Sequence, residues 1–131
     1  MPAEPANEVL DRLTAVGLID DRAFAELWVR SRHRERGLAR AALRQELTRK
    51  GVEPQVADEA LSQLDADDEH ATARRLVERK LATTRGLPTE TRIRRMVSLL
   101  ARKGYSSSAA YAVVRAALRD HEALELTEES R

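Results

Sequence analysis

A short motif that occurs twice constrains the fold of this chain more than any other feature of its sequence. Residues 49–52 read Arg-Lys-Gly-Val, and residues 102–105, 53 positions later, read Arg-Lys-Gly-Tyr. Each copy has the pattern of a helix C-terminus: basic side chains face the negative end of the helix dipole, glycine takes the left-handed conformation, and the apolar residue packs back on the helix. The chain is therefore predicted to contain the same helical unit twice.

Apolar positions repeat at the same offset, and glycine and proline separate the helices. The offset pairs Leu43 with Met96, Leu47 with Leu100, Ala60 with Val113, and Leu61 with Val114. No segment alternates apolar and polar residues in the manner of a strand. The predicted fold is all-α, with helices at about 7–16, 22–36, 38–50, 54–64, 68–84, 89–103 and 107–120.

These helices group into tandem three-helix repeats, two complete plus the last helix of a third. Residues 1–17 are predicted to hold that last helix, from an incomplete first repeat. Residues 18–65 form the second repeat and residues 66–120 the third, and residues 121–131 are an acidic, frayed tail.

The first helix of the second repeat has an apolar face with an arginine beside it. The predicted face consists of Phe24, Leu27, Trp28 and Ser31. Arg32 falls toward this face, which leaves two interpretations. Its guanidinium is buried and clamps a carboxylate such as Asp20 or Asp21, or its side chain extends past the face into solvent. The two aspartates are also expected to cap this helix.

Composition argues against several classes of function. The chain has no cysteine, which removes thiol nucleophiles, disulfides and Cys-ligated metals. His33, His70 and His121 lack ligand spacing, and no glycine-rich phosphate loop is present. No apolar run reaches the roughly 20 residues of a membrane span, and no signal peptide is visible. We expect a cytoplasmic, monomeric binding protein that is not an enzyme, with no cofactor, no metal and no membrane partner.

Charge is strongly segregated along the chain although its formal net value is only +1. Residues 22–51 carry +6 and residues 74–103 carry +8, so most of the acidic groups, 17 of 22, lie elsewhere. Rows of basic side chains on helices can bind phosphates or an acidic protein surface, or can be only solvated faces. The candidate binding residues are Arg30, Arg32, Arg34, Arg40, Arg44, Arg49, Lys50, Arg75, Arg79, Arg94, Arg95 and Arg102.

The second repeat resembles a known family. Residues 17–32 read Gly-Leu-Ile-Asp-Asp-Arg-Ala-Phe-Ala-Glu-Leu-Trp-Val-Arg-Ser-Arg, followed by Arg36-Gly37 and by Leu43-x-x-x-Leu47-x-x-Lys50-Gly51-Val52. This pattern is similar to the RecX family, bacterial regulatory proteins that modulate the RecA recombinase. The resemblance is specific over about 16–64 and weaker over 68–118. It departs from the family at the N-terminus, because members usually have a complete first repeat.

The resemblance implies both an arrangement and a function. The family fold is a set of tandem three-helix repeats in an elongated, curved arrangement. The implied function is negative modulation: the protein binds the groove of the RecA–DNA filament and suppresses ATP hydrolysis, filament growth and strand exchange in recombination, DNA repair and the SOS response. Family members also bind single- and double-stranded DNA weakly. The basic extended surface to which the family's activity is attributed corresponds here to the candidate arginine rows.

A second function remains open on the residues alone. Short three-helix units with a basic second helix also suit a direct DNA-binding protein built from helix-turn-helix-like modules. In the first function, affinity comes from the protein surface of the filament together with DNA. In the second function, DNA alone supplies it.

Overall fold

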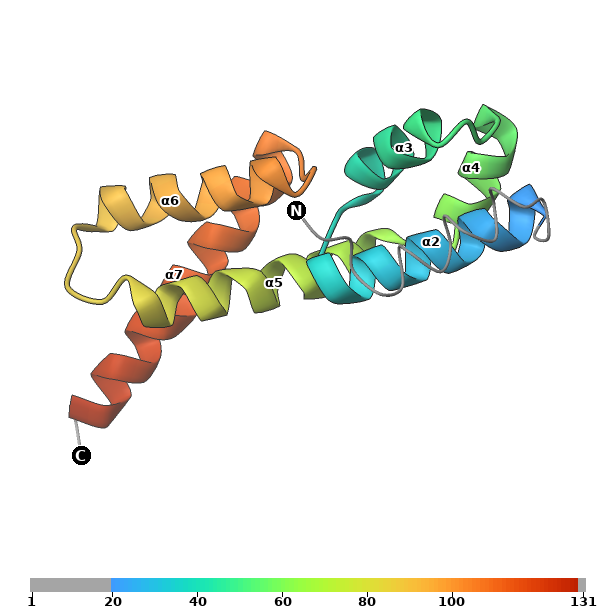
Figure 1. Ribbon diagram of the computed structural model, residues 1–131. Coiled ribbons are helices and arrows are strands. Elements are labelled where there is room, and N and C mark those ends of the chain that lie inside the picture. Colours follow the sequence, from blue (N-terminus) through green and yellow to red (C-terminus); the bar gives the residue numbers. More distant parts are fainter. Residues whose placement is uncertain (1–19, 130–131) are drawn as a thin grey trace. The chain divides into compact units, whose positions relative to one another are not determined.

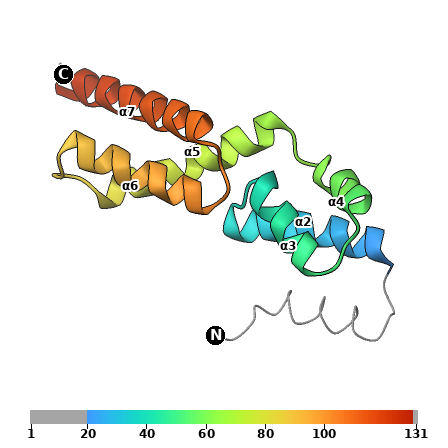
Figure 2. The same ribbon diagram turned by 90° about the horizontal axis from the view of Figure 1, so that it is seen from above.

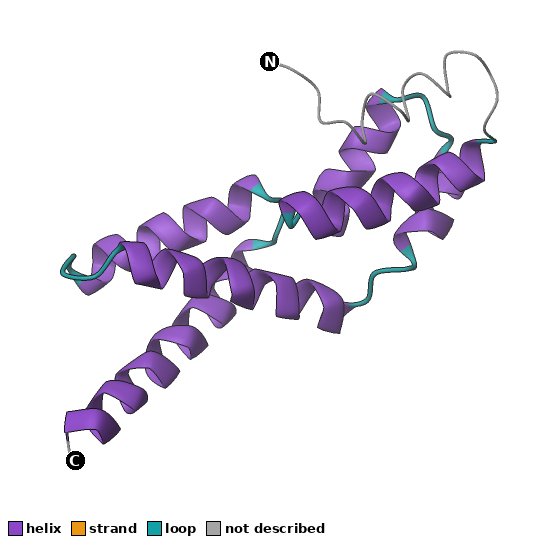
Figure 3. Cartoon of the chain, turned by 60° about the horizontal axis from the view of Figure 1, so that its bottom comes forward, coloured by secondary structure: helices purple, strands orange, loops and turns teal. Residues whose placement is uncertain are grey.

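Six helices make up the part of the chain that the computed structural model describes, residues 20–129 (Figure 1). The helix predicted at 7–16 lies outside these residues. No strand occurs among residues 20–129 (Figure 3), so the all-α prediction is confirmed. Over the same residues, every helix is too short or too polar to cross a bilayer. The helices are α2 (Asp21–Arg36), α3 (Arg40–Arg49), α4 (Pro54–Leu61), α5 (Ala66–Thr83), α6 (Thr89–Arg102) and α7 (Ser107–Glu129).

The helices divide after Asp65 into two compact units, each built of three consecutive helices. In the first unit α4 packs against both α2 and α3, and in the second unit α7 packs against both α5 and α6 (Figure 2). Each unit therefore has the same internal plan, in which the third helix closes over the first two.

Local capping fixes the ends of α2 where the sequence predicted them. The side chain of Asp20 accepts a hydrogen bond from the backbone N–H of Ala23 at 2.9 Å. At the other end, Gly37 has a φ of 68°, and its N–H donates to the carbonyl oxygen of His33 at 2.9 Å. Only glycine adopts this left-handed conformation without strain, so Gly37 ends the helix.

The duplicated motif forms the same helix-ending turn in both units. Gly51 and Gly104 have φ angles of +82° and +96°. The N–H of the following residue, Val52 or Tyr105, donates to the carbonyl oxygen of the residue five positions earlier, at 3.0 and 3.1 Å. These are the long hydrogen bonds of a Schellman motif, and both apolar residues are buried. The predicted helix ends are confirmed.

The first core is centred on a wider face of α2 than the sequence predicted. Phe24 and Trp28 are buried and stack with their ring centroids 5.7 Å apart. Ala25 and Val29 are also fully buried. The centre of the buried face therefore lies on the side of the helix away from Leu27. At 100° per residue, Leu27 lies about 130° from that centre. Its predicted core position is therefore wrong, and the side chain is 38% exposed.

The second core repeats the first at the predicted offset. All eight residues that the offset pairs with one another are buried. The last helix, however, is longer than predicted: α7 continues to Glu129, where the sequence indicated a frayed tail from residue 121. Residues 121–129 are rich in Ala, Leu and Glu and contain no Gly or Pro, so nothing in them stops a helix.

Burial of Tyr105 predicts a pH dependence of stability. Burial raises the pKa of the phenol, the negative charge of Glu69 raises it further, and Arg75 lowers it. Above pH of about 10 the unfolded chain loses a proton that the folded chain keeps, so stability falls by up to about 1.4 kcal/mol per pH unit. We expect urea unfolding between about pH 8 and 11 to show this fall, and Tyr105→Phe to reduce it. Equal slopes for both proteins would contradict the prediction, since the lysines titrate in each.

Candidate partner and nucleic-acid interface

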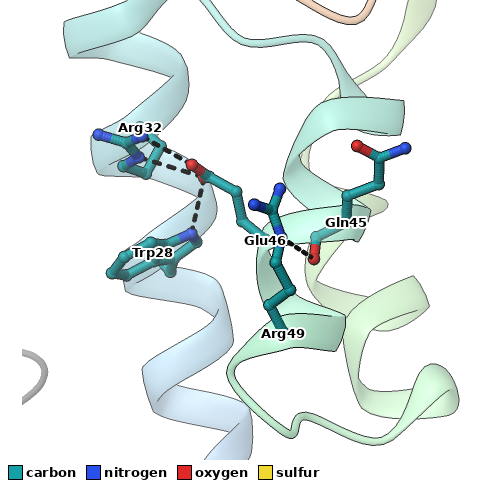
Figure 4. Close-up of polar contacts among 5 residues, drawn as sticks. All are labelled: Trp28, Arg32, Gln45, Glu46 and Arg49. Atoms are coloured by element: carbon teal, nitrogen blue, oxygen red, sulfur yellow. Dashed lines mark hydrogen bonds and ion pairs between the residues drawn. The ribbon is translucent and has the colours of Figure 1, made fainter.

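A carboxylate on α3 ties together two side chains of α2 (Figure 4). The indole Nε1 of Trp28 donates to Oε1 of Glu46 at 3.0 Å. Arg32 donates from Nε to Oε1 at 3.1 Å and from Nη2 to Oε2 at 2.6 Å. The Arg32 and Glu46 side chains are only 15% and 18% exposed. Such a forked, mostly buried pair is stronger than a surface ion pair, so it holds α2 against α3.

The first interpretation of Arg32 is confirmed in kind, because its guanidinium is mostly buried and clamps a carboxylate, but that carboxylate is Glu46 and not Asp20 or Asp21. Asp20 and Asp21 lie about 17 Å away along α2, at 1.5 Å per residue, which no single arginine spans while packed on its own helix. The solvent alternative is wrong, because the Arg32 side chain is only 15% exposed and its guanidinium is bonded to Glu46 (Figure 4). Glu46 was missed, although its place just before the buried Leu47 put it at the edge of the inward face of α3.

Trp28 is flanked by cations on the same network. The guanidinium carbon of Arg32 lies 5.6 Å from the centroid of the indole ring, and Nζ of Lys50 lies 4.9 Å from it. Both distances fall within the range of cation–π attraction. Lys50 itself is exposed, so it borders the network on the solvent side. The sequence predicts Trp28 only as a core residue and gives no indication of this contact.

The remaining predicted residues of the first unit divide into paired and unpaired groups. Arg44 forms an ion pair with Asp58 of α4, and Arg49 donates from Nε to the carbonyl oxygen of Gln45 at 3.4 Å. Arg40 is half-buried. Arg30 and Arg34 are exposed one turn apart on α2, and among residues 20–129 no carboxylate pairs with either of them.

In the second unit, the predicted cations lie on α5 and α6. Arg75 donates from Nη2 to Oγ1 of Thr72 at 3.0 Å, and Arg79 is exposed on the same helix. Hydrogen bonds from Arg74 to Glu78 and to Asp120, each at 2.8 Å, raise the pKa of that guanidinium. The contact with Asp120 joins α5 to α7, whereas the contact with Glu78 lies within α5, so the charge of Arg74 is neutralised inside the unit.

Three predicted arginines of α6 converge on one shallow hollow. Arg94, Arg95 and Arg102 line it together with Ser98, and Lys80 of α5 completes it. Its volume is about 260 Å³, and no acidic side chain lines it. The three arginines are among the residues predicted from the sequence, whereas Lys80 and Ser98 are not. The spacing of Ser98, three or four residues from each of the three arginines along α6, was a signal available in the sequence.

The acidic residues at the start of α5 have a structural explanation. Asp67, Asp68 and Glu69 lie in the first turn of α5, where carboxylates favour the positive end of the helix dipole. Among residues 20–129, no group of three or more acidic or histidine side chains is arranged to hold a metal ion.

The two units share one plan, and in each of them the basic residues are concentrated on the first two helices. This plan defines a protein of tandem three-helix domains. Comparison with known families gives the same division. Residues 20–61 match the second three-helix domain of RecX, and residues 67–114 match the third. The chain belongs to the RecX family.

Individual relatives agree over most of this chain. The regulatory protein RecX of Streptomyces coelicolor is 57% identical over 120 residues, which are 92% of this chain and 64% of that protein. The regulatory protein RecX of Thermobifida fusca is 52% identical over 115 residues, or 88% and 62% of the two chains. A crystal structure of regulatory protein RecX superposes with a TM-score of 0.66 at 28% identity, covering 83% of this chain and 53% of that one. The chain thus spans somewhat less than two thirds of the length of these relatives.

Proposed function

We propose that this chain is a non-catalytic regulator of the RecA recombinase that acts as a negative modulator. It binds the groove of the RecA–DNA filament as a monomer in the cytoplasm, and it suppresses ATP hydrolysis, filament growth and strand exchange during recombination, DNA repair and the SOS response. One observation carries the proposal beyond the family name. Each RecX domain in this chain exposes cations that its own carboxylates leave unneutralised, Arg30 and Arg34 in one and the α6 arginines in the other.

The distribution of pairing supports a binding role for these cations. Arg32 and Arg74 are joined to carboxylates that connect helices, and their charges stabilise the units. Arg30 and Arg34 make no such connection, and two like charges one turn apart repel each other slightly. An anionic partner removes this repulsion, and it accelerates encounter because long-range attraction steers the two molecules together.

The second candidate function is direct DNA binding by helix-turn-helix-like modules. The hollow on α6 favours it, because Arg94, Arg95 and Arg102 gather there without an acidic neighbour in its lining. The two functions predict different responses to competing DNA. A DNA-binding protein is titrated away from the filament by excess bare DNA, whereas a filament regulator also contacts the recombinase and is retained.

The deciding experiment measures the single-stranded-DNA-dependent ATPase rate of preformed RecA filaments during titration with this chain. We expect inhibition at well below one chain per recombinase, surviving an excess of bare duplex DNA. Inhibition that disappears in proportion to added DNA would favour the second function. No inhibition together with tight binding to bare DNA would overturn the regulator proposal.

Charge reversal on α2 tests whether this surface contacts the filament. Arg30→Glu with Arg34→Glu is expected to raise the chain concentration for half-maximal ATPase inhibition by about tenfold or more, because attraction to the filament becomes repulsion. Arg115→Glu with Arg119→Glu changes the same number of exposed charges on α7 and serves as the matched control. Circular dichroism verifies that both variants fold. Unchanged inhibition by the folded α2 variant would remove this pair from the interface.

A further inference from the structure

We propose that the hollow formed by α5 and α6 is a binding site for the phosphodiester backbone of nucleic acid. The hollow is lined by Lys80, Arg94, Arg95, Ser98 and Arg102. The proposal rests on the proposed function in one respect, because a filament regulator meets DNA as part of its target. It adds a defined site, two residues that the basic rows did not include, and the chemical group that the site holds.

The geometry brings cations from two helices to one place. Arg94, Ser98 and Arg102 follow each other at intervals of four residues, and Arg95 stands three residues before Ser98, so all four share one face of α6. Lys80 reaches the same hollow from α5. A solvated face consists of charges on a single helix. Here a second helix adds a cation to the same hollow, as expected of a binding site.

The donors suit phosphate oxygens. Three guanidinium groups supply forked N–H donors, which match the geometry of phosphate, and the lysine adds a compact charge. The hydroxyl of Ser98 can donate one further hydrogen bond. No acidic side chain lines the hollow, and among residues 20–129 no ion pair engages these four cations. The four charges therefore remain available to a ligand.

Comparison of the two domains isolates the feature that makes this site. At the 53-residue offset, Ser98 and Arg102 correspond to Gln45 and Arg49, which line a hollow on the same face of α3. Arg94 and Arg95 correspond to Ala41 and Ala42. In the first unit the neighbouring Arg44 is already paired with Asp58. The unneutralised cluster is thus particular to the third RecX domain.

Charge and length favour a polymer over a single ion. Four positive charges exceed what one free phosphate neutralises, while successive phosphodiesters carry one charge each. Arg94 and Arg102 are eight residues apart, or about 12 Å along the helix. A nucleic-acid strand places a phosphate about every 3.4 Å along the axis of a duplex, so several of them fall within that length.

The test measures the salt dependence of DNA affinity for the whole chain. Fluorescence anisotropy with a labelled duplex, between about 50 and 200 mM salt, gives the slope of log K against log salt, which changes by about 0.9 per phosphate contact. Arg95→Gln with Arg102→Gln is expected to reduce the magnitude of the slope by about 1.8, since two phosphate contacts are lost. If the affinity at 1 M salt is unchanged, the DNA affinity at 0.1 M salt then falls by about 60-fold. Lys80→Gln is expected to reduce it by about 0.9.

Controls separate a site from a general charge effect. Arg115→Gln with Arg119→Gln removes two exposed charges of the same unit outside the hollow and should leave the slope within about 0.3 of its original value. Ser98→Asp removes no cation, yet it should weaken DNA binding because it places a negative charge among the donors. Thermal unfolding by circular dichroism establishes that each variant is folded.

Each outcome bears on the proposal. Equal slopes for the hollow variants and the α7 control would overturn it, and so would an unchanged slope for Lys80→Gln. Poly-glutamate serves as a probe for an acidic protein segment. If the hollow variants lose binding to poly-glutamate but keep their affinity for DNA, the proposal is overturned and the hollow is reassigned to an acidic protein segment. If inorganic phosphate displaces the DNA no better than chloride at equal ionic strength, the site requires the polymer, as proposed; displacement by millimolar phosphate would assign it to a free anion instead.

The same variants keep this proposal distinct from the regulator function. A chain that fails to inhibit the recombinase ATPase but shows the expected slopes would overturn the regulator function and leave the site standing. If the chain inhibits the ATPase but its hollow variants bind DNA normally, the proposed site is overturned and the regulator function stands.

Discussion

Replacement of Leu47 by alanine is expected to lower the free energy of unfolding by about 2–5 kcal/mol. Leu47 is fully buried where α3 meets the core of the first unit, so truncation removes apolar contacts and leaves a cavity. Its repeat counterpart Leu100 is also fully buried, and Leu100→Ala should produce a loss of similar size in the second unit. The two substitutions together test whether the duplicated cores are energetically equivalent.

Urea denaturation followed by fluorescence measures the effect in the first unit directly. Trp28 is the only tryptophan and lies in the same core as Leu47, so its emission reports the unfolding of that unit. Leu27→Ala is the control, because Leu27 lies in the same unit and is 38% exposed, so its truncation should cost less than about 0.5 kcal/mol. A loss below that value for Leu47→Ala would mean that the residue does not fill the core.

Replacement of Glu46 by alanine is expected to destabilise the first unit by about 2–3 kcal/mol, since charged hydrogen bonds contribute about 1.5–3 kcal/mol and the mostly buried Arg32 loses its partner. Glu46→Gln keeps an oxygen that can accept from the indole of Trp28 but loses the charge. We expect its destabilisation to be about half as large.

A double-mutant cycle isolates the pair. Arg32→Met replaces the guanidinium by an apolar side chain and should destabilise the unit about as much as Glu46→Ala, because it leaves the mostly buried Glu46 carboxylate without that cation. The coupling free energy between the two substitutions should lie between about 0.5 and 3 kcal/mol. Strictly additive effects would show that the contact contributes no stability.

Features encoded by neighbouring residues could be predicted from the sequence. The caps at Asp20 and Gly37, and the helix ends at Gly51 and Gly104, depend on residues within one or two turns of each other. The buried positions could also be predicted, because the same apolar pattern occurs twice and each copy supports the assignment of the other. Family membership agreed with the division into three-helix domains at 20–61 and 67–114.

Features that depend on contacts between helices could not be predicted in the same way. The pairing of Arg32 with Glu46 requires knowing how α2 and α3 pack, and periodicity gives the face of a side chain but not its partner. The width of the buried face of α2, and with it the exposure of Leu27, also follows from packing. The convergence of Lys80 with the α6 arginines is a further case, since the two helices meet only in the folded unit.

The glycine-centred turn has a consequence for how these domains accommodate insertions. The connection between the second and third helices has four residues in both units, 50–53 and 103–106, whereas the preceding connection has three residues in one unit and five in the other, 37–39 and 84–88. Because one left-handed glycine and its paired hydrogen bonds set the direction in which the chain leaves the helix, the later connection acts as an elbow of fixed length. In the second unit the earlier connection is the place for grafted sequence, such as an affinity tag or a labelling site, because Arg85 and Gly86 are exposed there. The first unit does not offer the same place, because Gly37 caps α2 and Ala39 is buried.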